Sequence, residues 1–196
     1  MATPENAKND LQQAEQRLTT AFAAYNEGKL DKATEAFGDA EIRFRTGGDL
    51  KRAGDARSMI ADIQRTSNQF DQALRSYQRA KRLYHDAQRP LLEAESMLSA
   101  GHIERQLAHL DRAQEAYQGA QQIYRTHQQA QGLGNVELAL GHIELQRGNT
   151  VYANEHYQDA IQNYKVANDA INQADASRSL AELERLAHHF SDAEMA

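Results

Sequence analysis

The stretch GHIERQLAHLDRAQEAYQGA at residues 101–120 is followed forty positions later by GHIELQRGNTVYANEHYQDA at residues 141–160. Ten of the twenty paired positions are identical. Fainter copies of the same phrase begin at residues 21, 61 and 181, so the whole chain repeats itself at one period of forty residues. A fixed period of this size is typical of proteins that are built from stacked structural repeats.

One stripe of small and aromatic residues recurs in every full copy. In the first copy the stripe is Ala33, Phe37, Ala40 and Phe44, a spacing that places all four on one face of an α-helix. The next three copies keep alanine or an aromatic residue in these four columns: Ala73, Tyr77, Ala80, Tyr84, Ala113, Tyr117, Ala120, Tyr124, Ala153, Tyr157, Ala160 and Tyr164. We therefore predict a second helix in each repeat that buries this face.

A stripe upstream predicts the first helix of each repeat. In the third copy it consists of Ser96, Ala100, Ile103 and Leu107. One mid-helix column holds glycine or alanine in all five copies: Ala21, Ala61, Gly101, Gly141 and Ala181. Glycine inside a helix costs about 1 kcal/mol relative to alanine, so a column restricted to these two residues predicts the close approach of a neighbouring helix.

Composition excludes several classes of function. The chain has 196 residues and no cysteine, which removes disulfides, thiolate metal sites and cysteine nucleophiles. Its net charge of −6 argues against a nucleic-acid partner, because phosphate recognition needs a basic face. No apolar run reaches the roughly 18–20 residues that span a bilayer, and residues 1–10 lack the features of a secretion signal. We expect a cytoplasmic protein without membrane insertion.

The sequence predicts no enzyme, no cofactor and no metal site. Dinucleotide-binding, phosphate-binding, zinc-protease and nucleophile-elbow motifs are missing. The carboxylates of Glu104, Glu144 and Glu184 share a column, but paired catalytic carboxylates need a pocket that separates their pKa values. His102 and His142 also share a column and could begin a metal site. Because the column adds no third ligand of a suitable type next to them, we expect both imidazoles to form hydrogen bonds with a partner.

These columns resemble the tetratricopeptide repeat (TPR) family. The resemblance rests on a small residue in the first helix, a glycine at the turn and a small–aromatic–small pattern in the second helix: Ala21, Gly28, Ala33, Phe37 and Ala40, and again Gly141, Gly148, Ala153, Tyr157 and Ala160. The period of forty exceeds the usual period of about 34 and resembles the longer-helix variant of the family. The resemblance implies an all-α fold, a right-handed α-solenoid of antiparallel helix pairs.

The domain organisation follows from the register of the copies. We expect a flexible tail at residues 1–10 and a single solenoid at residues 11–196. Its repeats cover about 11–50, 51–90, 91–130 and 131–170, with a partial fifth repeat at 171–196.

The resemblance also implies where a partner would bind. In the family, residues just after the small column of the first helix line the concave groove. Carried over to this chain, the groove residues are Tyr25, Asp62, Arg65, His102, Arg105, Gln106, His142, Gln146 and Arg185. The implied function is a non-catalytic scaffold that binds a peptide or helix of another protein.

Three of the groove residues suggest the chemistry of the partner. Arg65, Arg105 and Arg185 could bind carboxylates through their planar guanidinium groups, so we expect an acidic or amphipathic partner. The alternative is local: each arginine pairs with an acidic neighbour such as Glu104 or Glu144.

The second hypothesis is a self-assembly module, which could also be a fragment of a larger regulatory protein. The fifth copy carries an apolar strip at Leu180, Leu183 and Ala187. Its second helix should begin near Ala193, where the sequence stops, so we expect no second helix to cover this strip. An uncovered apolar strip is an association site, and pairing through this end would give a two-fold homodimer. The strip could instead be buried on the preceding helix.

Overall fold

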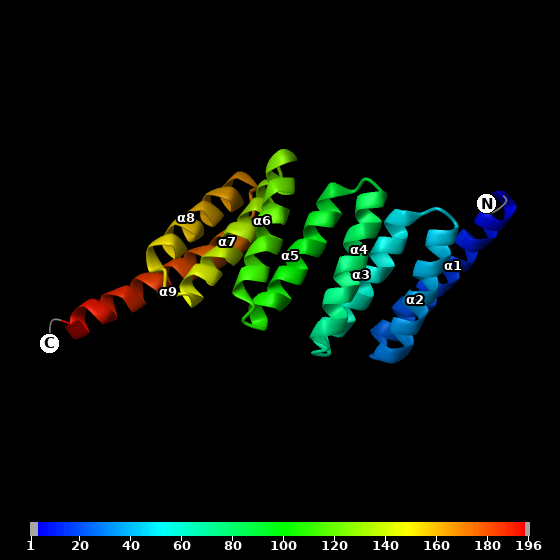
Figure 1. Cartoon of the computed structure of the whole chain (residues 1–196), viewed down its shortest axis with the longest axis horizontal. Helices are drawn as coiled ribbons and strands as arrows, with labels where there is room; N and C mark the ends of the chain where they lie inside the picture. Colours follow the sequence, from blue (N-terminus) through cyan, green and yellow to red (C-terminus); the bar gives the residue numbers. More distant parts are fainter. Residues whose placement is uncertain (1–3, 195–196) are drawn as a thin grey trace. The chain divides into compact units, whose positions relative to one another are not determined.

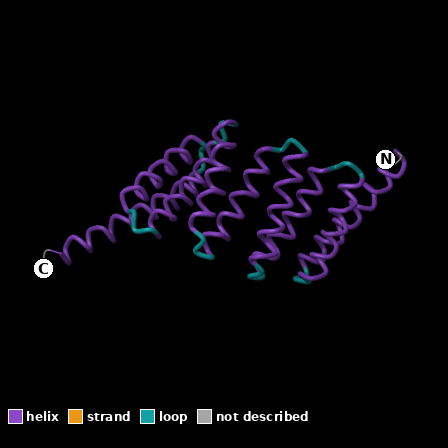
Figure 2. The backbone as a smooth tube through the Cα atoms, in the orientation of Figure 1, coloured by secondary structure: helices purple, strands orange, loops and turns teal. Residues whose placement is uncertain are grey.

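The structure is a computed structural model that describes the backbone of residues 4–194 and the side chains of residues 5–186. Within this range it contains nine α-helices and no strand (Figures 1 and 2). The helices are α1 (Pro4–Asn26), α2 (Leu30–Thr46), α3 (Leu50–Thr66), α4 (Phe70–Asp86), α5 (Pro90–Gln106), α6 (Leu110–Thr126), α7 (Ala130–Gln146), α8 (Thr150–Val166) and α9 (Ala170–Glu194). The predicted all-α class is confirmed.

One turn geometry connects all of these helices. The middle residue of each three-residue turn has a positive φ angle: Gly28, Gly48, Asn68, Gln88, Ala108, Gln128, Gly148 and Asn168. The next residue donates its backbone N–H to a carbonyl five residues earlier, as Lys29 does to Ala24 at 2.9 Å. This is the Schellman arrangement that closes the carbonyl end of a helix. Because α2 to α8 each have 17 residues, every helix pair occupies forty residues of the chain.

The predicted columns of the second helices form the core. Their alanines and aromatic residues in α2, α4, α6 and α8 are all buried, with no more than 4% of any residue exposed. The close approach predicted at the glycine/alanine column is also present in α7. A Cβ atom added at Gly141 would lie 2.5 Å from the ring of Tyr157 in α8. The repeated phrase therefore encodes packing within each helix pair.

The first helices bury a wider face than the predicted stripe. In α5, Ser96 and Ile103 are buried as expected, but Ala100 is half-buried. Leu107 lies outside α5, which ends at Gln106. Leu98 is also buried, because a helix that packs against neighbours on both sides covers more of its circumference than a single stripe.

The chain divides into two compact units, residues 1–103 and residues 104–196. In the first unit α1 packs on α2, α2 on α3, and α3 on α4. In the second unit α6 packs on α7, α7 on α8, and α8 on α9. A single solenoid across residues 11–196 stays a prediction.

The two ends of the helical array differ from expectation. Residues 4–10, which we expected in a flexible tail, belong to α1. Proline suits the first position of a helix, and Glu5 in the first turn favours the helix dipole. At the other end α9 continues to Glu194 without a turn after its first four helical turns.

The apolar strip of the fifth copy is partly covered. Leu183 is 2% exposed and packs with Ala153 and Tyr157 of α8. The expectation that Leu183 stays uncovered is therefore wrong, because α9 lies directly on α8. Ala187 and Ala193 lie outside the residues whose side chains are described.

Candidate partner-binding site

The structure distributes the predicted groove residues between the two units. The first unit contains Tyr25, Asp62, Arg65 and His102, and the second contains Arg105, Gln106, His142, Gln146 and Arg185. Asp62, Arg105 and His142 are half-buried, whereas the other six are exposed. The sequence pattern thus selected residues that the core leaves at least partly accessible, and their role in binding stays a prediction.

In the first unit a tyrosine and an arginine share one carboxylate. The Tyr77 hydroxyl donates to Asp62 Oδ1 at 2.6 Å, and Arg65 Nη2 lies 3.4 Å from the same oxygen. Burial and the bond to Asp62 raise the pKa of Tyr77 to about 12. The local alternative for Arg65 is therefore present in the structure: an acidic residue one helical turn away neutralises its charge.

Arg185 is also neutralised on its own helix. Its Nε donates to Glu182 Oε2 at 2.9 Å and its Nη2 donates to Glu182 Oε1 at 2.5 Å. This bidentate pair lowers the pKa of Glu182 and raises the pKa of Arg185. A partner carboxylate would have to displace Glu182 before it could bind this guanidinium group.

Arg105 has a different environment from the other two arginines. Its Nε is buried and has no hydrogen-bond partner among the described residues. The acidic residues expected to neutralise it are engaged elsewhere. Glu104 Oε2 lies 2.8 Å from His109, and Glu144 Oε1 lies 3.0 Å from Arg147 Nη1.

Neutral polar groups gather around His142 in the second unit. The His142 ring meets the Tyr157 ring edge-on, with centroids 5.5 Å apart and planes at 66°. Burial, and to a lesser degree the charge of Arg105, lower the pKa of His142 to about 4, so its imidazole is neutral at pH 7. Ser179 Oγ lies 3.5 Å from His142 Nε2. The Tyr157 hydroxyl is buried without a hydrogen-bond partner among the described residues.

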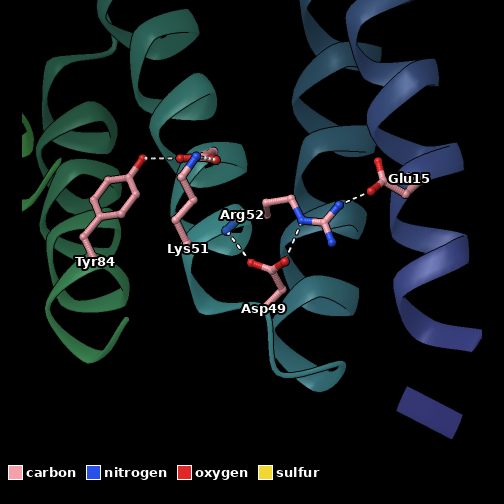
Figure 3. Close-up of polar contacts among 6 residues, drawn as sticks. Glu15, Asp49, Lys51, Arg52 and Tyr84 are labelled. Atoms are coloured by element: carbon pink, nitrogen blue, oxygen red, sulfur yellow. Dashed lines mark hydrogen bonds and ion pairs between the residues drawn. The ribbon is translucent and has the colours of Figure 1, made fainter. Parts of the chain in front are cut away.

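A second polar cluster, in the first unit, is satisfied internally (Figure 3). Asp49 caps α3 by accepting the backbone N–H of Arg52 at 2.9 Å and also accepts from Arg52 Nε at 2.6 Å. Arg52 forms a further ion pair with Glu15 of α1. The Tyr84 hydroxyl of α4 donates to Asp55 at 3.1 Å. These contacts fasten α1 and α4 to α3, so we assign this cluster to stability.

A buried charge in the first unit was not found from the sequence. Glu41 of α2 is 1% exposed and pairs with Arg79 Nη2 at 2.5 Å and with Arg57 Nη1 at 3.5 Å. The equivalent positions of later repeats hold a lysine, a glutamine and an isoleucine, so the column gave no signal. Ser179 lies outside the repeated columns and gave no signal either, and the buried column of Tyr157 gave no indication of the environment of its hydroxyl.

No cluster of three or more histidine, aspartate or glutamate side chains that could hold a metal ion occurs among the side chains the structure describes. No helix in the described part of the chain is long and apolar enough to cross a bilayer.

Comparison with protein families identifies a family for this chain. The family model of the soluble NSF attachment protein, SNAP, matches residues 1–121. A search of curated protein sequences found no match.

Solved structures share the fold at low sequence identity. BtubC (BKLC) from P. vanneervenii matches with a TM-score of 0.66 and 16% identity over 94% of this chain and 91% of that protein. The apo form of RapI matches with a TM-score of 0.79 and 11% identity, and aspartyl phosphate phosphatase F from Bacillus subtilis with 0.78 and 14%. The matches cover 91% and 94% of this chain but only 50% and 51% of those two proteins. These likenesses confirm a TPR-like helical-repeat fold.

Proposed function

The chain belongs to the soluble NSF attachment protein (SNAP) family, and from this premise we propose that it is a non-catalytic scaffold that holds a segment of a partner protein. The family name describes attachment to another protein. Carried to this chain, the name supports a protein partner rather than a small-molecule substrate. We further propose that the repeats are the longer-helix variant of the TPR family and that they form one solenoid over residues 11–196.

One observation carries this proposal: the first helix of each pair presents side chains that the core does not use. The second helices bury their small and aromatic columns almost completely. On α1, Phe22 and Tyr25 remain 42% and 39% exposed, and Gln106 and Gln146 are exposed at the ends of α5 and α7. Outside its buried columns α8 also exposes Val151 and Tyr152, at 68% and 59%. Exposed aromatic residues on a rigid element supply a large contact area at a low entropic cost, as interface residues commonly do.

We propose that the predicted groove residues bind the partner and that the partner is acidic or amphipathic. The contribution of each arginine to binding then depends on whether an acidic residue of the chain already neutralises its charge. Arg65 and Arg185 already have acidic partners, and Arg105 Nε has none among the described residues.

The non-catalytic part of the proposal has its own test. One similar structure is named an aspartyl phosphate phosphatase, and the match covers 51% of that protein. We expect a phosphorylated protein to lose its aspartyl phosphate no faster with the purified chain than without it. Faster loss of phosphate, proportional to the amount of chain added, would contradict the scaffold role.

The binding face is tested with two matched double variants. Gln106→Glu with Gln146→Glu adds two charges to the first helices, and Gln118→Glu with Gln158→Glu adds two charges to the second helices. All four glutamines are exposed, and each pair is forty residues apart. In affinity capture from native lysate, we expect the first variant to lose proteins that the wild type and the second variant retain. Equal retention by both variants would place the binding surface elsewhere.

Self-association is the second candidate function, and exposed apolar side chains favour it. Val166 and Ile171 are 63% and 78% exposed on either side of the turn between α8 and α9. A dimer formed there should be lost in Val166→Lys with Ile171→Lys. Light scattering over a hundredfold range of concentration measures this directly, and a monomeric mass throughout would rule the candidate out.

A further inference from the structure

In the first unit, the second helix α4 packs on both of the helices that precede it. On α3, Gln64 Oε1 accepts the hydroxyl of Ser76 of α4 at 2.7 Å. On α2, Glu41 Oε1 pairs with Arg79 Nη2 of α4 at 2.5 Å. A helix of the chain therefore occupies the side that α2 and α3 present to the following helix.

The second unit presents the same side of a helix pair without a second helix to cover it. α8 and α9 match α2 and α3 in the forty-residue register, and α9 packs on α8. The helices that match α9, which are α3, α5 and α7, have 17 residues and end in a turn. α9 has 25 residues and continues through that position (Figure 1). No described helix therefore takes the place that α4 takes in the first unit.

An open groove of about 360 Å³ lies at this place in the second unit. Its lining comes from the start of α8 and from α9: Thr150, Val151, Asn154, Glu155, Leu183 and Glu184. At the matching place of the first unit, a cavity is lined by residues 28–32 and Ser67, at the turns and the start of α2. The groove of the second unit extends about one helical turn further along both helices. It therefore reaches the part of the helix pair that α4 covers in the first unit.

Val151 makes this groove apolar where the other repeats carry a charge. Its side chain is exposed, and its column holds Asp31, Asp71 and Asp111, which are exposed as well. Packing within a repeat therefore does not require valine at this position. Leu183 supplies a second apolar side chain from α9. An apolar strip rimmed by polar groups is typical of a protein-binding surface.

Two carboxylates give the groove a negative charge. Glu155 and Glu184 are exposed, and neither forms an ion pair or a side-chain hydrogen bond with another described residue. Glu144, which occupies the column of Glu184, accepts Asn149 Nδ2 at 2.6 Å from the turn that follows its helix. Because α9 has no turn at this position, Glu184 lacks the corresponding donor among the described residues. Both carboxylates are therefore available to a cationic partner.

The charge of the whole unit adds to this local preference. Residues 104–196 contain 13 aspartate and glutamate residues and seven lysine and arginine residues, whereas residues 1–103 contain 15 of each kind. The net charge of −6 thus belongs entirely to the second unit. Such a field attracts a basic segment and repels an acidic one.

We propose that the groove between α8 and α9 binds a basic amphipathic helix of a partner protein. The apolar face of that helix contacts Val151 and Leu183, and its lysine or arginine side chains pair with Glu155 and Glu184. The helix takes the place in the second unit that α4 takes in the first. The groove contains none of the residues predicted to bind an acidic segment on the first helices, so the chain offers sites for two segments of opposite charge.

The probe is a synthetic peptide with the sequence of residues 70–86, the helix that occupies this place in the first unit. It contains four lysine and arginine residues and two aspartates. We expect the labelled peptide to bind the full-length chain saturably in fluorescence anisotropy, and more weakly as salt is added. An isolated helix of 17 residues is marginally stable in water, so the complex should show more helical circular dichroism than the sum of its parts. The control peptide carries Arg75→Glu and Arg82→Glu and should bind at least about tenfold more weakly.

Two double variants of the chain test the carboxylates. Glu155→Lys with Glu184→Lys should weaken binding of the peptide by about tenfold or more. Glu115→Lys with Asp159→Lys changes the net charge equally at residues outside the groove and should have a much smaller effect. All four side chains are exposed, so both variants should fold like the wild type. Equal effects of the two variants, or no binding of the peptide to the wild type, would overturn the site.

A matched pair of valine variants tests the apolar contact. Val151→Asn should weaken binding of the peptide about threefold, whereas Val166→Asn, at the similarly exposed other end of α8, should leave it unchanged. Equal affinities of the two variants would contradict the proposal. A dimer mass in light scattering that Val151→Asn abolishes would assign the groove to a second copy of the chain and would also overturn the proposal. Because the capture experiment with Gln106 and Gln146 probes other residues, the scaffold function is judged separately.

Discussion

The unpaired hydroxyl of Tyr157 makes a stability prediction of unusual sign. Most substitutions of buried residues destabilise a protein, but Tyr157→Phe should leave the free energy of unfolding unchanged or raise it by up to about 1 kcal/mol. The hydroxyl is desolvated and forms no hydrogen bond with the described residues, so its removal loses no bond and relieves a cost. Phenylalanine fits this column, because Phe37 occupies it in the first repeat and is fully buried.

Tyr164→Phe, seven residues further along α8, is the internal reference. Its hydroxyl donates to Asn135 Oδ1 at 2.8 Å, and both partners lose this bond in the variant. A hydrogen bond between neutral groups contributes about 0.5–1.5 kcal/mol to stability. Asn135 is half-buried and can be rehydrated, so we expect a loss of about 1 kcal/mol. The two variants should therefore differ by about 1–2 kcal/mol.

Urea unfolding followed by circular dichroism at 222 nm measures both variants against the wild type. Both tyrosines lie on one helix of one unit, so the same cooperative transition reports both substitutions. The slopes of the transitions should agree among the three proteins, because the surface exposed on unfolding is nearly constant. If Tyr157→Phe costs as much as Tyr164→Phe, the hydroxyl of Tyr157 has an internal partner and the reasoning fails.

Four further predictions concern stability. Ala108→Gly should raise the free energy of unfolding by about 1 kcal/mol, because Ala108 holds a φ of 60° that glycine adopts freely. Calorimetry should show the corresponding rise in melting temperature. Gly141→Ala should cost about 1–2 kcal/mol in urea unfolding, because its Cβ would meet the Tyr157 ring at 2.5 Å. Lowering the pH from 7 to 4.5 should reduce the free energy of unfolding by about 2 kcal/mol through His142. Its pKa of about 4 in the folded chain lies below its ordinary value, so at pH 4.5 the imidazole is protonated in the unfolded chain and mostly neutral in the folded chain. The loss should be smaller by that amount in His142→Phe. Glu41→Ala should cost about 2–3 kcal/mol in urea unfolding, because two arginines lose their shared carboxylate but remain partly solvated.

The core was predictable because packing restricts residue types at a fixed spacing. The column of Ala33, Ala73, Ala113 and Ala153 is fully buried, as its composition indicated. The turns were less predictable, because the helix packing holds every turn in one geometry whatever residue it contains. Ala108 and Gln128 adopt positive φ angles that their residue types do not favour, so residue type gave no indication of this geometry at those turns.

The candidate site was predictable only at the level of its face. The spacing selected Arg65, Arg105 and Arg185 together, but their environments depend on contacts between helices. Asp62 and Glu182 neutralise two of them from one helical turn away. The sequence shows that these pairs are within reach, but it does not show whether they form. For Arg105, the two acidic residues expected to neutralise it, Glu104 and Glu144, each pair with a residue of the turn that follows their own helix. Whether the Tyr157 hydroxyl has an acceptor likewise depends on the residue in the Asp62 column, which is His142 in this repeat.

The central claim is that the first helix of each pair, and not the second, holds the partner. The most direct measurement places a photo-crosslinking amino acid at Gln146 of α7 and, in a separate protein, at Gln158 of α8, and maps the products from cells by mass spectrometry. Both side chains are exposed, so both probes are accessible. The account predicts a reproducible crosslink to a segment rich in aspartate and glutamate from position 146 and none to that segment from position 158. Crosslinks to one segment from position 158 alone would contradict it.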